Sequence, residues 1–256
     1  NYTMTYYDDL TNDKKRVNSF KRAIYEKTSG ITYDLGTGSG ILAQLAANHA
    51  KKVYALEQNP FIIKSTKKNL SKYDNIELIK TDASRYEFPE KADTIICEML
   101  DTALIDEEQV PVINNAHKYI KEDTVFIPKS VYSTVEIIST NINHITYYED
   151  NIPEYISLSD EIKYHSISFQ DVICEKVNVE ISINIMKAGK INALKITTYT
   201  ILTDNIILEP TPMLNPPIIV PVDCMDVDVD DEIIINMEYI MGGGLNTLKT
   251  NIRRNK

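Results

Sequence analysis

The sequence predicts an α/β chain in two parts: a parallel sheet with helices on both faces, followed by an antiparallel β-barrel or sandwich. Up to Pro128, short apolar segments alternate with helically spaced ones, as in strands joined by helices. Beyond Pro128, segments rich in β-branched residues follow one another with few helix signals. We therefore expect one domain over residues 1–128 and a second over 129–256.

The first domain is expected to open with an amphipathic helix from Leu10 to Glu26, because Val17, Phe20, Ala23 and Ile24 recur at helical spacing. The elements expected after it are strand 31–35, helix 41–50, strand 52–57, helix 59–70, strand 76–79, strand 92–97, helix 106–120 and strand 124–127.

The second domain is expected to contain strands over residues 131–138, 177–186, 193–202 and 232–240. Five prolines between Pro210 and Pro221 predict a loop with edge segments. The alternating acids from Asp223 to Glu232 predict a half-exposed strand. The Gly242–Gly244 run lies between two strand-like segments, which favours a hairpin turn over a ligand site.

Composition excludes several classes of protein. The chain has 256 residues, 43% of them hydrophobic, which is enough to bury a core, and its formal net charge is −10. That balance argues against disorder and against general nucleic-acid binding, which needs a basic surface. No apolar stretch approaches a membrane span of about 18 residues. Three scattered cysteines predict no disulfide framework or metal site and fit a reducing cytoplasm.

Only 8 glycines are present, and three of them lie in the segment Asp34-Leu-Gly-Thr-Gly-Ser-Gly40, between an expected strand and an expected helix. Such a loop turns backbone N–H groups and a helix N-terminus toward a ligand. Glu57 ends the second strand, where an acid can accept hydrogen bonds from ribose hydroxyls. Asp82 follows the third strand, where an adenine edge could lie.

This combination resembles the class I S-adenosylmethionine-dependent methyltransferases, whose motifs follow the first four strands of a Rossmann-like sheet. The resemblance implies S-adenosylmethionine as cofactor and assigns it the residues Asp34, Gly36, Thr37, Gly38, Gly40, Glu57, Gln58, Asp82, Ala83 and Glu98. A dinucleotide-binding oxidoreductase is the minor alternative, although GxGxG lacks the third-glycine spacing that this class prefers.

Further segments are similar to one branch, the protein arginine methyltransferases. Tyr6-Tyr7 and the stretch Asp13–Ile24 match its N-terminal motifs. The match implies that Arg16 binds the cofactor carboxylate, as a planar guanidinium does well, and that Tyr7 belongs to a lid over the cofactor. Glu98 and Glu107, nine residues apart, match the two glutamates that clamp a substrate guanidinium in that family. Their carboxylates could also collect the proton of the attacking nitrogen.

The chain also departs from that branch. It contains no tryptophan, and Met99-Leu100-Asp101-Thr102 follows the first glutamate. The family's Thr-His-Trp loop would fall near residues 193–195, which contain no histidine. The insert between Ile138 and Val177, which forms the family's dimerisation arm, is shorter here, so the family's ring-like dimer is not expected from it. Asp101 adds a carboxylate, which favours a cationic substrate, either a protein side chain or a small amine.

The predicted function is therefore N-methylation of a cationic, arginine-like side chain of a protein or peptide. Two alternatives stay open. One is methylation of RNA or a small molecule, although the Asn-Pro-Pro-Tyr-like tetrad of base methyltransferases does not follow the fourth strand, where Glu98-Met-Leu-Asp101 stands. The other is a degenerate fold that binds the cofactor and serves as a regulatory module.

Overall fold

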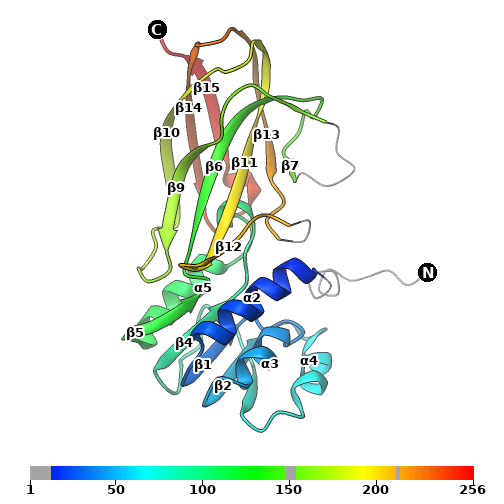
Figure 1. The fold of residues 1–256 in the computed structure, drawn as a ribbon, viewed down its shortest axis with the longest axis vertical. Coiled ribbons are helices and arrows are strands. Elements are labelled where there is room, and N and C mark those ends of the chain that lie inside the picture. Colours follow the sequence, from blue (N-terminus) through cyan, green and yellow to red (C-terminus); the bar gives the residue numbers. More distant parts are fainter. Residues whose placement is uncertain (1–12, 148–153, 212–213) are drawn as a thin grey trace, which may run out of the picture.

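A computed structural model describes residues 13–147, 154–211 and 214–256 of the chain. Figure 1 shows a parallel sheet with its helices at one end of the molecule and long antiparallel strands at the other. The predicted fold class, a Rossmann-like sheet followed by an antiparallel β-domain, is confirmed.

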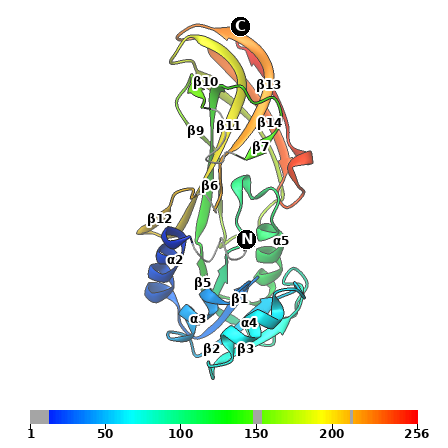
Figure 2. The ribbon, with the colours of Figure 1, turned by 90° about the vertical axis from the view of Figure 1, so that its right-hand side faces the viewer.

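The parallel sheet has five strands in the order β3-β2-β1-β4-β5. This order places the carboxyl ends of β1 and β4 side by side, at the point where an open α/β sheet binds its ligand. Figure 2 shows α2 and α5 on opposite sides of the sheet. The elements are α2 Lys14–Lys27, β1 Ile31–Leu35, α3 Ile41–Ala47, β2 Lys52–Glu57, α4 Ile63–Leu70, β3 Ile76–Lys80, β4 Ala92–Cys97, α5 Gln109–Ala116 and β5 Ile120–Ile127.

The helix α2 begins at Lys14, because the Asp13 side chain accepts a hydrogen bond from the Arg16 backbone N–H and caps it. Its buried face consists of Arg16, Phe20, Ala23 and Ile24. The predicted apolar stripe is therefore confirmed at three positions, whereas Val17 is only half-buried and the charged Arg16 is buried beside the stripe.

Three predicted helices are shorter in the structure, and the one expected over residues 41–50 ends at Ala47. The helix expected from Asn59 begins at Ile63, because the Asn59 side chain accepts a hydrogen bond from the Phe61 N–H and forms a turn first. The helix expected over 106–120 is reduced to α5, which places Pro111 in the first turn, where proline is tolerated. The residues after it form a short 3₁₀ turn, and β5 then begins four residues earlier than predicted.

The second half is antiparallel, as predicted, and consists of a seven-stranded and a three-stranded sheet. The strands expected over 131–138, 177–186, 193–202 and 232–240 correspond to β6, β10, β11 and β14. The elements are β6 Ser130–Ser139, β7 Thr146–Tyr147, β8 Ile156–Ser157, β9 Ile162–Ser168, β10 Lys176–Asn184, β11 Gly189–Thr203, β12 Ile206–Leu208, β13 Ile218–Val227, β14 Glu232–Ile240 and β15 Lys249–Arg254.

Three features of this half differ from expectation. The acidic stretch begins inside β13 but turns at Asp228–Asp231, so only its first part is a strand. Residues 193–195, where the Thr-His-Trp loop was expected, lie inside the 15-residue strand β11 and do not form a loop. The strands β7, β8, β9 and β12 were not predicted, and β13 begins at Ile218, inside the expected proline-rich loop.

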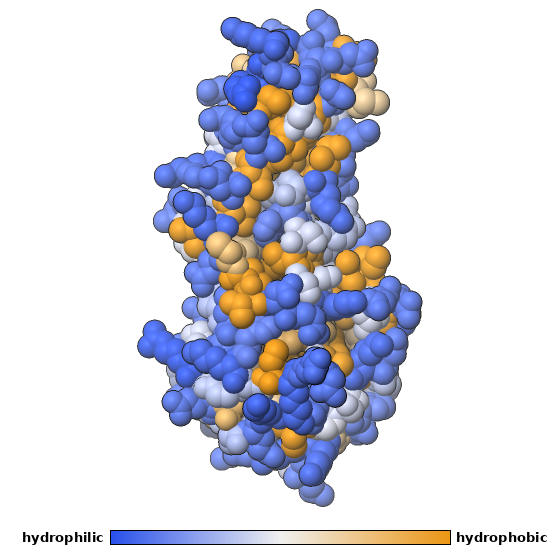
Figure 3. Space-filling view, turned by 90° about the vertical axis from the view of Figure 1, so that its left-hand side faces the viewer, coloured by the Kyte–Doolittle hydropathy of each residue, from blue (hydrophilic) through white to orange (hydrophobic). Residues whose placement is uncertain are grey.

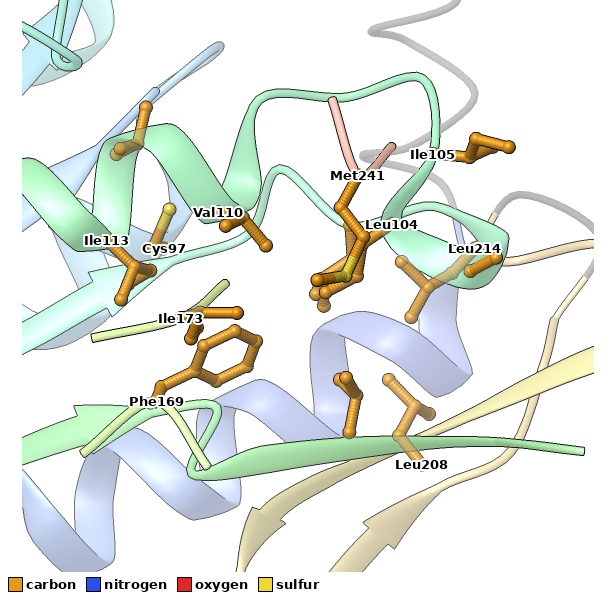
Figure 4. Packing of buried hydrophobic residues seen from close by; sticks show 14 of the residues in the cluster. Cys97, Leu104, Ile105, Val110, Ile113, Phe169, Ile173, Leu208, Leu214 and Met241 are labelled. Atoms are coloured by element: carbon orange, nitrogen blue, oxygen red, sulfur yellow. The ribbon is translucent and has the colours of Figure 1, made fainter. Parts of the chain in front are cut away.

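One apolar core runs through both halves. Figure 4 shows side chains from β4, α5 and the loop before α5 packed against Phe169, Leu208 and Met241 of the antiparallel half. Figure 3 shows a mainly hydrophilic surface with bands of apolar side chains along the antiparallel half and across the junction. Among the helices of the described residues, none is long and apolar enough to cross a membrane.

Candidate active site

The glycine loop leaves β1 at the carboxyl end of the sheet. Gly36, Gly38 and Gly40 all have positive φ, of 73°, 58° and 90°, which other residues rarely adopt. A side chain at Gly36 would also meet the Met99 side chain, 2.9 Å from the added carbon. The loop therefore needs glycine at Gly36 both for its backbone conformation and for the close approach of Met99.

Glu57 ends β2 and fixes the glycine loop from the side. Its two carboxylate oxygens each accept a 2.9 Å hydrogen bond, one from the backbone N–H of Gly38 and one from that of Asn59. The residue is only 7% exposed, so the carboxylate is held in one orientation at the sheet edge. Each oxygen has a second lone pair for a ligand donor.

Asp34 lies behind the glycine loop and is fully buried. Its Oδ2 accepts a 2.6 Å hydrogen bond from the Thr37 hydroxyl. Burial raises the pKa of Asp34 to about 7, although this hydrogen bond opposes the shift. Asp34 and Thr37 thus support the loop from beneath, and neither is part of the cavity wall described below.

Asp82 and Ala83 follow β3. Asp82 Oδ1 accepts hydrogen bonds from the backbone N–H of Ser84 at 3.0 Å and from its hydroxyl at 2.7 Å, which lowers the pKa of the carboxyl. The amide of Asn115, buried in α5, donates to the backbone carbonyl of Ala83 at 3.0 Å. Both residues at this strand end are therefore held by hydrogen bonds.

A cavity of about 490 Å³ joins these strand ends to the segment after β4. Its volume is typical of a small-molecule site. The predicted site residues that it brings together are Gly36, Glu57, Gln58, Asp82, Ala83, Glu98 and Glu107, and the other wall residues are Leu56, Asn59, Pro60, Thr81, Met99, Leu100, Glu108 and Val112. Tyr7 lies outside the described residues.

Glu98, the residue after β4, forms an ion pair with Arg16 of α2. Arg16 Nη1 lies 2.7 Å from Glu98 Oε2, and the two side chains are 3% and 11% exposed. Burial raises the pKa of Glu98 to about 7, and the guanidinium opposes this shift. Arg16, which was predicted to bind the cofactor carboxylate, is therefore paired directly with Glu98, the first of the two glutamates predicted to hold the substrate.

Gln109 holds the backbone on both sides of Glu98, a role that the sequence analysis missed. Its Nε2 donates to the Cys97 carbonyl at 2.8 Å, and its Oε1 accepts from the Met99 N–H at 2.9 Å. Gln109 is fully buried. A polar residue at the start of a mainly apolar helix was the available signal, and Asn115 in the same helix gave a similar one.

Asp101 has a role different from the one expected. Its oxygens accept hydrogen bonds from the backbone N–H groups of Asp106 at 3.0 Å and Glu107 at 3.2 Å. Asp101 was expected to add a carboxylate for the substrate. In the structure its side chain instead stabilises the loop between the two glutamates. Glu107 itself is half-buried on the cavity wall, and its pKa is raised by burial and by the neighbouring acids Asp106 and Glu108.

The cavity suits a nucleoside with a charged tail. The Glu57 carboxylate at the end of β2 provides acceptors for the paired hydroxyls of a ribose. Gly36 has no side chain, so a ligand in the cavity can lie close to its backbone. The buried guanidinium of Arg16 lies beside Glu98 at the other end of the wall. These features fit S-adenosylmethionine.

Comparison with known proteins decides the family. A model of the methyltransferase domain matches residues 27–187. The chain belongs to this methyltransferase family. The predicted recognition of a class I methyltransferase is thereby confirmed, and with it S-adenosylmethionine as the cofactor.

The relatives of this methyltransferase are of two kinds. It is 39% identical over 247 residues to an uncharacterised protein of Methanothermobacter thermautotrophicus, spanning 96% of this chain and 97% of the relative. It is 40% identical over 250 residues to an uncharacterised protein of Methanocaldococcus jannaschii, spanning 95% of each. It is also 30% identical over 134 residues to protein arginine N-methyltransferase 6 of Danio rerio, spanning 49% of this chain and 38% of that protein.

A solved structure matches nearly the whole methyltransferase. The Trypanosoma brucei PRMT1 enzyme–prozyme heterotetrameric complex with AdoHcy superposes with a TM-score of 0.77 at 15% identity, covering 96% of this chain and 95% of that chain. The likeness shows that the fold is shared over both halves.

Proposed function

We propose that this methyltransferase transfers the methyl group of S-adenosylmethionine to a nitrogen of a cationic, arginine-like side chain in a protein or peptide. The observation that carries the proposal is that Glu98 and Glu107 line the same cavity as Gly36 and Glu57. A site for a nucleoside and a pair of carboxylates would thus lie in the same cavity. The sequence similarity to protein arginine N-methyltransferase 6 over half the chain supports the same choice of acceptor.

The residues of the cavity divide into two groups by their chemistry. Glu57, Asp82, Ala83 and the glycine loop would hold the nucleoside, and Arg16 would hold its carboxylate. S-adenosylmethionine, when bound, supplies an electrophilic methyl group on a positively charged sulfur, which leaves as a neutral thioether.

Glu98 and Glu107 would hold the acceptor. Two carboxylates on one wall can grip a planar cation in a fixed orientation, which supplies the alignment that a displacement at carbon requires. A carboxylate with a pKa near 7, as in Glu98, can also receive the proton that the acceptor nitrogen loses. The exposed acids Asp106 and Glu108 would add to the attraction of a cation.

The test is radiolabelled methyl transfer into a lysate that is then separated into protein, RNA and small molecules. We expect label in protein, released as methylated arginine on hydrolysis, and loss of that label with Glu98→Gln. Retained binding of the demethylated cofactor by Glu98→Gln would show that this variant is folded.

Other outcomes would overturn the proposal. Label in RNA or in a small amine would show that this molecule, and not a protein side chain, is the methyl acceptor. Cofactor binding without label in any pool would favour a regulatory module. Full activity of Glu98→Gln would exclude the assigned role of Glu98.

A further inference from the structure

The loop between the two glutamates, residues 101–107, has an unfavourable backbone. Ala103 and Leu104 have φ values of 60° and 54°, the left-handed conformation that side chains other than glycine rarely adopt. Both residues are buried. Such a conformation persists only where the surrounding structure determines it, and it is common at functional sites. Asp101 supplies part of that constraint from within the loop, and the rest comes from outside the parallel-sheet domain.

The turn between β14 and β15, residues 242–245, binds this loop directly. Gly242 N–H donates to the Leu104 carbonyl at 2.9 Å, and Gly244 N–H donates to the Ile105 carbonyl at 2.8 Å. Leu245 N–H donates to Asp106 Oδ1 at 3.1 Å. Three N–H donors of one turn therefore bind three successive residues of the loop.

The glycines of the turn are needed for this contact. Gly242 and Gly244 have φ values of 79° and 98°. A side chain at Gly242 would lie 3.6 Å from the Glu107 carbonyl, so the turn reaches the backbone of the second glutamate itself. The hairpin predicted from the sequence is present, and the loop contact is an additional feature of it.

Other parts of the antiparallel half reach the same loop. The Thr198 hydroxyl in β11 accepts from the Ala103 N–H at 2.8 Å and is bonded to the Ser133 hydroxyl of β6 at 2.7 Å. The Thr102 hydroxyl donates to the Pro216 carbonyl at 2.6 Å, and the Tyr147 hydroxyl donates to Asp106 Oδ2. The loop is thus held from several strands at once.

We propose that the turn 242–245 is a positioning element for methyl transfer: it fixes the loop 101–107 and thereby sets Glu107 relative to Glu98. This inference rests on the proposed function, in which the two carboxylates hold the acceptor. The antiparallel domain then contributes to catalysis through the geometry of the other domain's carboxylates.

One position offers a matched pair of variants. Leu245 is the first residue of a 3₁₀ turn, and Gly244 before it has ψ 162°, which suits a following proline. Leu245→Pro removes the N–H that donates to Asp106, whereas Leu245→Ala shortens the side chain and keeps that N–H. Only the proline variant removes this one of the three hydrogen bonds between the turn and the loop.

Hydrogen exchange of the Asp106 and Glu107 amides is the first readout. We expect exchange about tenfold faster in Leu245→Pro than in Leu245→Ala, the size of one lost hydrogen bond to a charged group. In methyl-transfer assays we expect Leu245→Pro to raise KM for the acceptor several-fold, while the affinity for the demethylated cofactor stays that of Leu245→Ala. Equal exchange and equal KM in the two variants would overturn the proposal.

A second pair of variants tests the same contact if the proline variant does not fold. Asp106→Ala removes the acceptor of both Leu245 and Tyr147, whereas Tyr147→Phe removes only the tyrosine's bond. Faster hydrogen exchange of the loop amides in Asp106→Ala than in Tyr147→Phe supports the contact between the turn and the loop, and equal exchange overturns the proposal. Because hydrogen exchange needs no methyl acceptor, a difference in exchange without methylation of any pool would contradict the proposed function and leave only the structural contact between the turn and the loop.

Discussion

Arg16 Nη1 lies 2.7 Å from Glu98 Oε2, with both side chains almost fully buried between α2 and the end of β4. The pair joins residues 82 positions apart in the chain. Because an isolated charge is costly in such a site, each partner depends on the other. In the proposed reaction this ion pair would connect the two ligands, since Arg16 is proposed to bind the cofactor carboxylate and Glu98 to bind the acceptor.

Removal of the guanidinium alone should destabilise the protein strongly. At pH 8, above the Glu98 pKa of about 7, we expect Arg16→Met to lower the free energy of unfolding by about 3–5 kcal/mol, because it removes the cation of the buried Glu98 carboxylate. Urea denaturation of the single variants and of the double variant Arg16→Met/Glu98→Gln measures this. The double variant should recover most of the loss, and strictly additive losses would contradict the coupling.

Glu57 should be important for cofactor affinity. Glu57→Ala removes the proposed acceptor of the ribose hydroxyls and also frees the Gly38 N–H that holds the glycine loop. We expect the affinity for the demethylated cofactor, measured by calorimetry, to fall about 100-fold, which corresponds to about 3 kcal/mol. Asp34→Asn is the comparison, since Asp34 is not part of the cavity wall and its loss should change affinity far less. Unchanged binding by Glu57→Ala would exclude the proposed cofactor site.

The sequence predicted what depends on local pattern and on the topology of a parallel sheet. The glycine loop, Glu57 and Asp82 each follow a strand, and parallel strands bring their carboxyl ends to one edge. Gln109 and Asp101 could not be predicted in the same way. Their partners are backbone groups, which carry no sequence signal, and the pairings exist only once the loop has folded.

The antiparallel half shows the same limit. Its long strands have a clear apolar pattern, and β14 has the predicted bounds, Glu232–Ile240. The strand β12 has three residues and pairs only with β11 in the described part of the chain, so its sequence carries too short a pattern. The contact of the 242–245 turn with the loop 101–107 joins positions about 140 residues apart, and only the folded chain reveals it.

The contact between Gly36 and Met99 gives a steric prediction. Gly36→Ala places a methyl group 2.9 Å from the Met99 Cγ and Sδ atoms at a φ of 73°. We expect cofactor affinity to fall at least tenfold in calorimetry, because the loop must move. Gly36→Ala/Met99→Ala should regain part of the affinity, since it removes the clash but not the backbone strain. No recovery in the double variant would show that backbone strain alone is responsible.

Asp34 predicts how stability without ligand changes with pH. Burial raises its pKa to about 7 from an ordinary value of 3.8. Between these values the native state binds more protons than the unfolded state, so the free energy of unfolding falls as pH rises from about 4 to 7 and levels off above 7. At about 1.4 kcal/mol per pKa unit, Asp34 accounts for a fall of about 4 kcal/mol. Burial also raises the pKa of Glu98 and Asp101 to about 7, so they add to the same slope.

Urea denaturation at a series of pH values tests this dependence. Asp34→Asn cannot ionise, so its stability should fall less than that of the unaltered protein between pH 5 and pH 7.5. Asp82→Asn is the control with the opposite sign, because hydrogen bonds from Ser84 lower the pKa of Asp82, and its contribution to stability is lost only as pH falls through that lowered pKa. The slope between pH 5 and 7.5 should therefore be unchanged in Asp82→Asn. An equal slope in Asp34→Asn and the unaltered protein would show that Asp34 titrates near its ordinary pKa, with its charge stabilised inside the fold.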